Sequence, residues 1–147
     1  MNHLFVLLVF AINIALPAMA TETSPAGLWR SFNSGTKEPN ALIRVTEVNG
    51  ELTARVEKLF VPAGQDPNPI CGHCEGERKG KPVQGMIILW GLKKDGDVYV
   101  GGQVFEPFSG KSYKSKVSLK AGGAQLSVLG YIGLPMMGRS QVWEREK

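Results

Sequence analysis

The sequence has little of the chemistry from which catalytic and metal sites are built. It contains two histidines and two cysteines among 147 residues, and only His73 follows the hydrophobic N-terminus. A closed zinc site usually takes four Cys or His ligands, and a Ser-His-Asp triad would have to use His73. The composition therefore predicts no metal or other cofactor and favours a protein that is not an enzyme.

Long hydrophobic runs are absent after the first segment. Residues 4–16 are apolar except for Asn13, Pro17 ends the run, and Ala18-Met19-Ala20 matches a signal-peptidase site. The run is short for a transmembrane helix, and no later segment approaches the needed length. The pattern predicts a cleaved signal peptide over 1–20, no stable membrane span afterwards, and an exported mature domain of 21–147.

A strong excess of charge of one sign is also missing. The net charge is +4, and the densest basic cluster, Arg78-Lys79-Gly80-Lys81, has no aromatic residues interleaved with it. A nucleic-acid surface usually carries more positive charge together with aromatic side chains. We therefore expect no nucleic-acid partner and interpret the cluster as a solvated loop.

The pattern that is present is that of β-structure. Apolar and polar residues alternate, turn residues recur at short intervals, and no stretch keeps a helical period. Asn49-Gly50 is a strong hairpin signal, and lysines and serines alternate with apolar residues over 112–120. The expected strands cover 27–32, 41–48, 52–60, 83–92, 98–105, 112–120, 125–131 and 139–145.

These strands predict an all-β domain. Tight turns between consecutive strands favour an up-and-down antiparallel order. Eight such strands can close into a barrel, which removes exposed edges and leaves room inside for side chains or one small ligand. The expected fold is an eight-stranded antiparallel up-and-down barrel, and a β-sandwich is the alternative.

The one long connection, 61–82, contains both cysteines and four of the nine prolines. Paired thiols outside the cytoplasm tend to oxidise, so we expect a disulfide between Cys71 and Cys74 that shapes this loop. Cys-Gly-His-Cys also serves thiol–disulfide oxidoreductases, but residues 75–82 lack the apolar helix face that such a centre needs. A structural disulfide is the preferred interpretation, with redox activity and metal binding as alternatives.

Several short motifs occur from about residue 27 to residue 145. They are Gly27-Leu28-Trp29, Asp66-Pro67-x-Pro69-Ile70-Cys71-x-x-Cys74, Gly85 with Ile88-Leu89-Trp90-Gly91-Leu92, Gly130-Tyr131-Ile132-Gly133, and Gly138-Arg139 with Trp143 and Arg145. Together they resemble DUF2147, a family of exported bacterial proteins of unknown function. The resemblance implies an all-β domain in the bacterial periplasm or outside the cell, without supplying a reaction.

A looser resemblance is to lipocalin-like barrels. Those barrels begin with Gly-x-Trp on the first strand and place an arginine of the last strand over that tryptophan. Gly27 and Trp29 match the first element, and Arg139 or Arg145, on the strand that also carries Trp143, could supply the second. The resemblance implies a barrel-closing role for these residues, because a guanidinium packs well over an indole.

A few side chains could line a ligand site. The apolar candidates lie in the most apolar strand or just before the last strand, where a barrel mouth could be. Their alternative role is packing in the core. Two strand arginines could bind the acid group of a ligand, and their alternative is to face solvent. Strand glutamates such as Glu47, Glu57 and Glu106 are expected to face solvent. The ligand candidates are Trp90, Met86, Ile88, Met136, Met137, Arg44 and Arg55.

The sequence therefore predicts a non-enzymatic module of the bacterial envelope that binds a small apolar or amphipathic ligand. Two alternatives stay open. One is a structural module that contacts an envelope protein through the 61–82 loop. The other is a thiol–disulfide oxidoreductase that uses Cys71 and Cys74.

Overall fold

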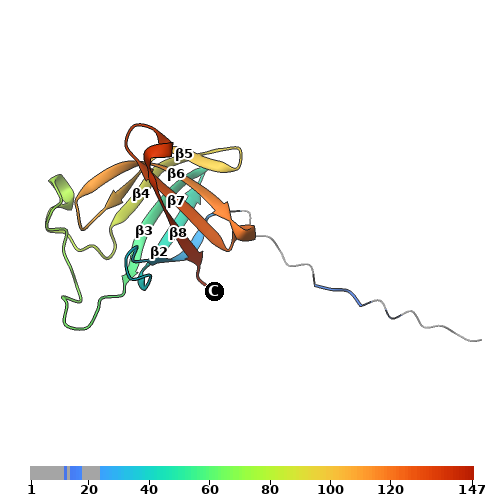
Figure 1. Cartoon of the computed structure of the whole chain (residues 1–147), viewed down its shortest axis with the longest axis horizontal. Coiled ribbons are helices and arrows are strands. Elements are labelled where there is room, and N and C mark those ends of the chain that lie inside the picture. Colours follow the sequence, from blue (N-terminus) through green and yellow to red (C-terminus); the bar gives the residue numbers. More distant parts are fainter. Residues whose placement is uncertain (1–11, 13, 18–23) are drawn as a thin grey trace, which may run out of the picture.

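The computed structural model describes residues 12, 14–17 and 24–147, so most of the expected signal peptide lies outside the described residues (Figure 1). Residues 27–145 form eight strands, with short 3-10 helices in three of the connections. The strands are β1 (Gly27–Phe32), β2 (Pro39–Val48), β3 (Glu51–Leu59), β4 (Ile87–Asp95), β5 (Val98–Glu106), β6 (Lys111–Lys120), β7 (Gln125–Tyr131) and β8 (Arg139–Arg145). The 3-10 helices are η1 (Gly76–Arg78), η2 (Ala121–Gly123) and η3 (Pro135–Met137).

The strands form one closed antiparallel barrel. Each strand pairs with its neighbour in sequence, and β1 completes the ring by pairing with β8, where Trp29 lies opposite Arg145. This confirms the expected eight-stranded up-and-down barrel. The sandwich alternative is wrong, because the first and last strands are hydrogen-bonded to each other instead of lying at open edges.

The expected strand bounds agree closely with the structure except at the fourth strand. β4 begins at Ile87, four residues later than the apolar run over 83–92 indicates. The Val83 N–H donates to the Pro69 carbonyl at 3.0 Å, and Gly85 adopts a φ of 91° in the left-handed region. Residues 83–86 therefore complete the long connection before the strand begins.

Connections alternate between the two ends of an up-and-down barrel. One end, the short-turn end, carries residues 24–26 and the turns that follow β2, β4 and β6. The other, the long-loop end, carries the connections 33–38, 60–86, 107–110 and 132–138. Figure 1 shows the green 60–86 connection on the left, opposite the yellow β4–β5 turn on the right. The longest and most varied segments thus share one end.

Large apolar side chains fill the interior near the short-turn end. Toward the long-loop end some inward positions are small, where Ser31 pairs with Ala41 and Ser115 pairs with Gly130. Packing of large groups in the depth of the barrel leaves an enclosed ligand little room there. The interior residues with no exposed surface are Trp29, Leu52, Ala54, Leu89, Leu92, Val117 and Leu126.

Candidate functional site

Trp29 lies at the centre of the short-turn end. Its side chain has no exposed surface, and its indole N–H donates to the Pro25 carbonyl at 2.9 Å. The Arg145 guanidinium carbon lies 4.3 Å from the centre of the Trp29 ring. Gly27 leaves room for this arginine, because a Cβ on Gly27 would lie 2.8 Å from Arg145 Nη1.

Arg145 also ties together three segments of backbone. Its guanidinium donates to the carbonyls of Gly123 at 2.8 Å, Ala26 at 3.0 Å and Ser24 at 2.8 Å. These bonds join the start of the folded chain, the β6–β7 turn and the last strand. Each of its three nitrogens is therefore engaged, which leaves this arginine poorly suited to hold a ligand.

Arg139 lies at the opposite end of the same strand. It pairs with Gly130, is exposed, and does not approach Trp29, so Arg145 is the arginine that covers the tryptophan. Trp143 is buried between them and donates from its indole N–H to Gln141 Oε1 at 3.3 Å.

Glu47 takes part in a second network at the short-turn end. Its carboxylate accepts hydrogen bonds from Tyr99 Oη at 2.7 Å and Ser24 Oγ at 2.6 Å. The Ser24 hydrogen bond is the main cause that lowers the pKa of Glu47, and burial with the Glu47 contact raises the pKa of Tyr99 to about 12.

The expectation of solvent-facing glutamates is therefore wrong for Glu47. Alternation after Ile43 and Val45 places residue 47 on the inward face, a signal that the sequence contains. Glu57 and Glu106 are exposed, as expected. Glu57 forms an ion pair with Arg44 on the outer wall, so these carboxylates do not assemble into a catalytic pair.

The disulfide joins Cys71 and Cys74 and anchors the long connection to the barrel. Both cysteines are almost fully buried, and Cys71 Sγ lies 3.1 Å from the Pro107 carbonyl in the β5–β6 turn. Gly110 in the same turn fits closely under the connection, since a Cβ there would lie 2.1 Å from the His73 carbonyl oxygen. The connection is thus held against the β5–β6 turn by contacts within the disulfide-closed segment 71–74.

The same connection covers the outer face of β4 and β5. Trp90 pairs with the exposed Gln103, which places the indole outside the barrel. The Arg78 guanidinium lies 4.7 Å from the centre of the Trp90 ring and 4.5 Å from that of Phe105. Trp90 therefore belongs to a packed contact outside the barrel, and the interior location considered for it as a ligand residue is wrong.

The remaining ligand candidates are dispersed. Met86 and Ile88 are buried at the junction of the connection with β4. Arg44 and Arg55 are exposed on the outer wall, where Arg44 meets Glu57 and Arg55 donates to the Gly85 carbonyl. An inward role for either arginine is wrong, because both alternate with the buried residues of their strands.

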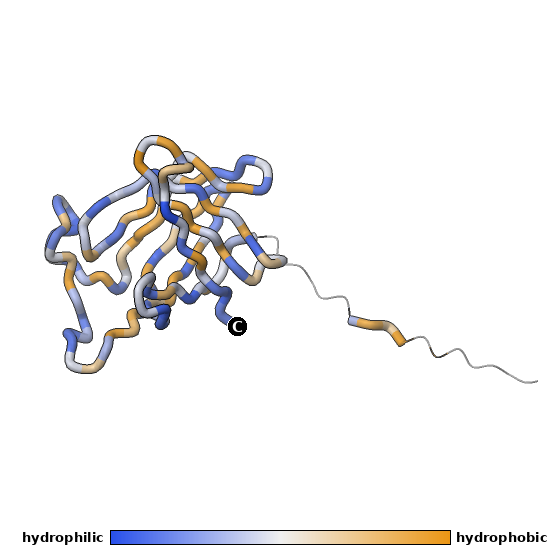
Figure 2. Tube along the Cα trace, viewed as in Figure 1, coloured by the Kyte–Doolittle hydropathy of each residue, from blue (hydrophilic) through white to orange (hydrophobic). Residues whose placement is uncertain are grey.

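Met136 and Met137 lie on the β7–β8 connection with exposed fractions of 86% and 76%. They belong to a group of apolar side chains at the long-loop end that sequence reasoning had only partly identified. Figure 2 shows the apolar colour along this connection. The group comprises Ile70, Phe108, Ile132, Leu134, Met136 and Met137.

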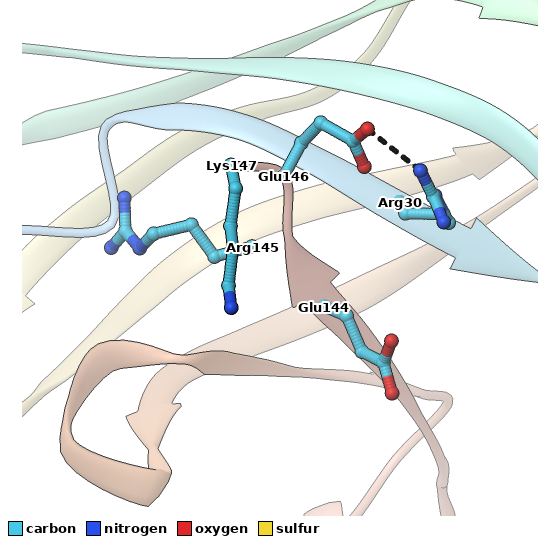
Figure 3. Close-up of a pocket in the computed structure, with 5 residues that line it drawn as sticks. All are labelled: Arg30, Glu144, Arg145, Glu146 and Lys147. Atoms are coloured by element: carbon cyan, nitrogen blue, oxygen red, sulfur yellow. Dashed lines mark hydrogen bonds and ion pairs between the residues drawn. The ribbon is translucent and has the colours of Figure 1, made fainter.

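A surface depression of about 260 Å³ lies outside the barrel beside the β1–β8 pairing (Figure 3). Arg30 Nη2 meets Glu146 Oε1 at 2.6 Å there, and Arg145 is committed to backbone carbonyls. Glu144 and Lys147 complete the lining. Because its charges are of mixed sign and partly paired, this depression does not select a ligand of one charge.

Within the described part of the chain, no three His, Cys, Asp or Glu side chains gather closely enough to hold a metal ion. Across residues 12, 14–17 and 24–147, no helix combines the length and apolar character that crossing a membrane would take.

Comparison with known proteins agrees with this architecture. Residues 27–145 match the family model described as "Uncharacterized protein conserved in bacteria (DUF2147)". The chain belongs to the DUF2147 family. The match covers all eight strands of the barrel and includes both Gly27 and Arg145.

A solved structure supports the fold of this DUF2147 member. Protein HP1028 from Helicobacter pylori, described as belonging to the lipocalin family, superposes with a TM-score of 0.68 over 84% of each chain at 18% identity. This similarity confirms the lipocalin-like fold. No curated protein matches the chain.

Proposed function

We propose that this DUF2147 member is a non-enzymatic binding module of the bacterial envelope, which takes a small apolar or amphipathic molecule at the long-loop end of the barrel. The observation that carries the proposal is the distribution of exposed apolar side chains. Of the eight large ones that follow residue 24, six lie on connections of this end. Exposed apolar groups concentrated in one place are typical of a binding surface.

The inward-facing positions near the same end support a shallow site. Tyr113 and Val104 pair with each other and are partly exposed, whereas the deeper Trp29 has no exposed surface. Arg139 and Gln141 have the inward register of Trp143 but remain exposed. A ligand with an apolar tail and an acid group would therefore meet Arg139 at the mouth, with its tail beside the apolar connections.

An envelope location is part of the proposal. The apolar N-terminal pattern, the Cys71–Cys74 disulfide and membership of a bacterial family all favour a protein exported to the periplasm or beyond. Secretion of an epitope-tagged full chain, followed by N-terminal sequencing, would show cleavage after Ala20. An accumulated protein that still carries residues 1–20 would contradict the proposed export and cleavage.

A fluorescent fatty acid titrated into the mature domain tests the binding proposal. We expect saturable binding that weakens by about tenfold in Arg139→Glu, since a repelled acid group loses one charge-assisted contact. Lys120→Glu makes the same charge change on an exposed residue at the other end of the barrel and should leave Kd unchanged. Absence of saturable binding, or equal Kd values for both variants and wild type, would refute the proposed site.

An interaction role for the long connection is the second candidate. The disulfide, the Pro107 contact and the Arg78 stacking hold this connection in one conformation, with His73 and Glu75 exposed on it. A pre-ordered loop loses little entropy on binding a partner. Capture of an envelope protein that His73→Ala with Glu75→Ala abolishes, while the fold is retained, would favour this candidate.

Thiol–disulfide exchange is the least favoured function. Cys71 has no exposed surface and Cys74 is 3% exposed, and exchange needs access to a sulfur. An insulin-reduction assay that gives equal background rates for wild type and Cys71→Ser is the expected result.

A further inference from the structure

We propose that the long-loop end docks on the surface of an anionic phospholipid bilayer, with the β7–β8 connection entering the headgroup region. The connection presents four large apolar side chains that contact little of the protein. Their exposed fractions are 75% for Ile132, 60% for Leu134, 86% for Met136 and 76% for Met137. Apolar groups projecting from a surface loop gain free energy when they enter the boundary between headgroups and acyl chains.

The charge around this connection identifies the kind of surface that it fits. Residues 107–143 contain five cations and no aspartate or glutamate. All five cations are exposed, and neither ion pair found in the described residues involves them. Exposed cations beside apolar groups favour anionic lipid headgroups over neutral ones. The cations are Lys111, Lys114, Lys116, Lys120 and Arg139.

Strand pairing and sequence place three of these cations, Lys114, Lys116 and Arg139, next to the apolar connection. Lys114 lies opposite Tyr131, the residue directly before Ile132, and Lys116 lies opposite Leu129 on the same outer face. Arg139 follows the connection at the start of β8. Lys120, at the far end of the same face of β6, is six residues or roughly 20 Å from Lys114.

Glu106 lies opposite Lys111, so the basic surface nearest the loop is that of Lys114, Lys116 and Arg139. A basic surface beside an apolar loop is matched by a bilayer that offers both negative charge and hydrocarbon. A protein partner would need complementary acidic and apolar groups in one fixed arrangement, whereas a fluid bilayer adapts to the loop. A second copy of this chain presents the same positive charge, which disfavours self-association through this face.

Sedimentation of the mature domain with vesicles tests the proposal. We expect binding to vesicles rich in phosphatidylglycerol, weaker binding as salt increases, and little binding to phosphatidylcholine vesicles. Met136→Asp with Met137→Asp should reduce partitioning by at least about tenfold, and Lys114→Glu with Lys116→Glu should do the same.

Two matched variants separate this surface from general effects of charge. Lys120→Glu reverses a charge on the same strand face, but its distance from Lys114 exceeds the screening length of about 8 Å in physiological salt. Val48→Asp adds a carboxylate at the short-turn end, where Val48 is 66% exposed. Both variants should sediment with phosphatidylglycerol vesicles as the wild type does. Far-ultraviolet circular dichroism should show all variants folded.

Three results would overturn the proposal. They are no sedimentation of wild type with anionic vesicles, equal binding to phosphatidylcholine vesicles, and a loss in Lys120→Glu as large as that in the Lys114 and Lys116 variant. A dimer in vesicle-free solution that Met136→Asp and Met137→Asp dissociate would assign the loop to a second copy instead. The outward Lys114 and Lys116 belong to docking alone, so fatty-acid binding measured without vesicles can fail or succeed independently of the vesicle result for the Lys114 and Lys116 variant.

Discussion

The two ends of the barrel contrast in how their side chains are used. At the short-turn end, Trp29 is enclosed, and Arg145 and Glu47 bond to the segment that begins at Ser24. At the long-loop end, large apolar side chains such as Met136 and Phe108 lie in solvent. The network that joins the first and last strands thus lies at one end, and most of the exposed large apolar side chains lie at the other.

This contrast shows why one small barrel can tolerate so much exposed apolar surface. The β1–β8 pairing and the Arg145 network that close the ring involve none of the six exposed apolar side chains of the long-loop end. Exposed apolar residues usually mark a binding site when the fold does not need them. Substitutions at matched positions of the two ends should therefore separate stability from binding.

The largest expected effect is that of Trp29→Ala. Loss of a fully buried indole, with its Arg145 contact and Pro25 hydrogen bond, should lower the free energy of unfolding by about 4 kcal/mol. Phe108→Ala, at a residue 59% exposed at the other end, should change it by less than about 0.5 kcal/mol. Urea denaturation followed by circular dichroism measures both. Similar losses would contradict the division between the ends.

The stabilities of Arg145→Lys and Arg139→Lys compare the two ends of the barrel within one strand, β8. The guanidinium of Arg145 donates to the carbonyls of Gly123, Ala26 and Ser24, an arrangement that a lysine ammonium cannot reproduce. Arg145→Lys should therefore lower the free energy of unfolding by about 2 kcal/mol. Arg139 makes no such bonds among the described residues, and Arg139→Lys should lie within about 0.5 kcal/mol of wild type. Equal midpoints in urea for the two variants would show that the Arg145 network does not stabilise the ring.

Removing the disulfide should have a more local effect. By loop entropy, closing so small a ring contributes about 1.9 kcal/mol, so Cys71→Ala with Cys74→Ala should destabilise by about that amount. Faster hydrogen exchange should appear in residues 60–86, with the strands at the short-turn end protected as in wild type. Faster exchange spread evenly over all eight strands would mean that the connection supports the whole barrel.

The smallest effect concerns pH. The pKa of Glu47 is lowered in the folded protein, so its contribution is present above the unfolded pKa and is lost as pH falls through the folded pKa. Unfolding free energies measured from pH 6 to pH 2, a range of about four units that spans ordinary carboxyl titration, should fall less steeply in Glu47→Gln. Tyr99 gives the alkaline counterpart, because its pKa of about 12 means that stability falls as pH rises above about 10. If the free energy of unfolding falls equally between about pH 6 and about pH 2 in wild type and Glu47→Gln, Glu47 makes no such contribution.

Much of the barrel could be predicted from alternation alone. In β6, lysines and serines alternate with Tyr113, Val117 and Leu119 and so predict one polar face and one apolar face. The structure has the same two faces. Alternation could not choose between Arg139 and Arg145, because both positions have the same parity on β8. Only their distance along the strand, and hence which end they reach, separates the two.

The fourth strand shows where alternation failed. Leu89 and Leu92 are both fully buried although they are three residues apart, because the pairing with β3 shifts between them beside Gly91, whose φ is 72°. This irregularity breaks the period of two that would group Trp90 with an inward face. The covering of Trp90 by Arg78 depends on how a long connection folds back, which no local pattern in the sequence encodes.

The pairing of β1 with β8 closes the barrel through contacts that are distant along the chain. Ser24 and Arg145 are bonded although 121 positions separate them. Loop-closure entropy makes contacts so distant along the chain slow to form, and the ring stays open until β8 is available. A chain that is still being synthesised therefore cannot complete the ring before β8 is free to pair with β1.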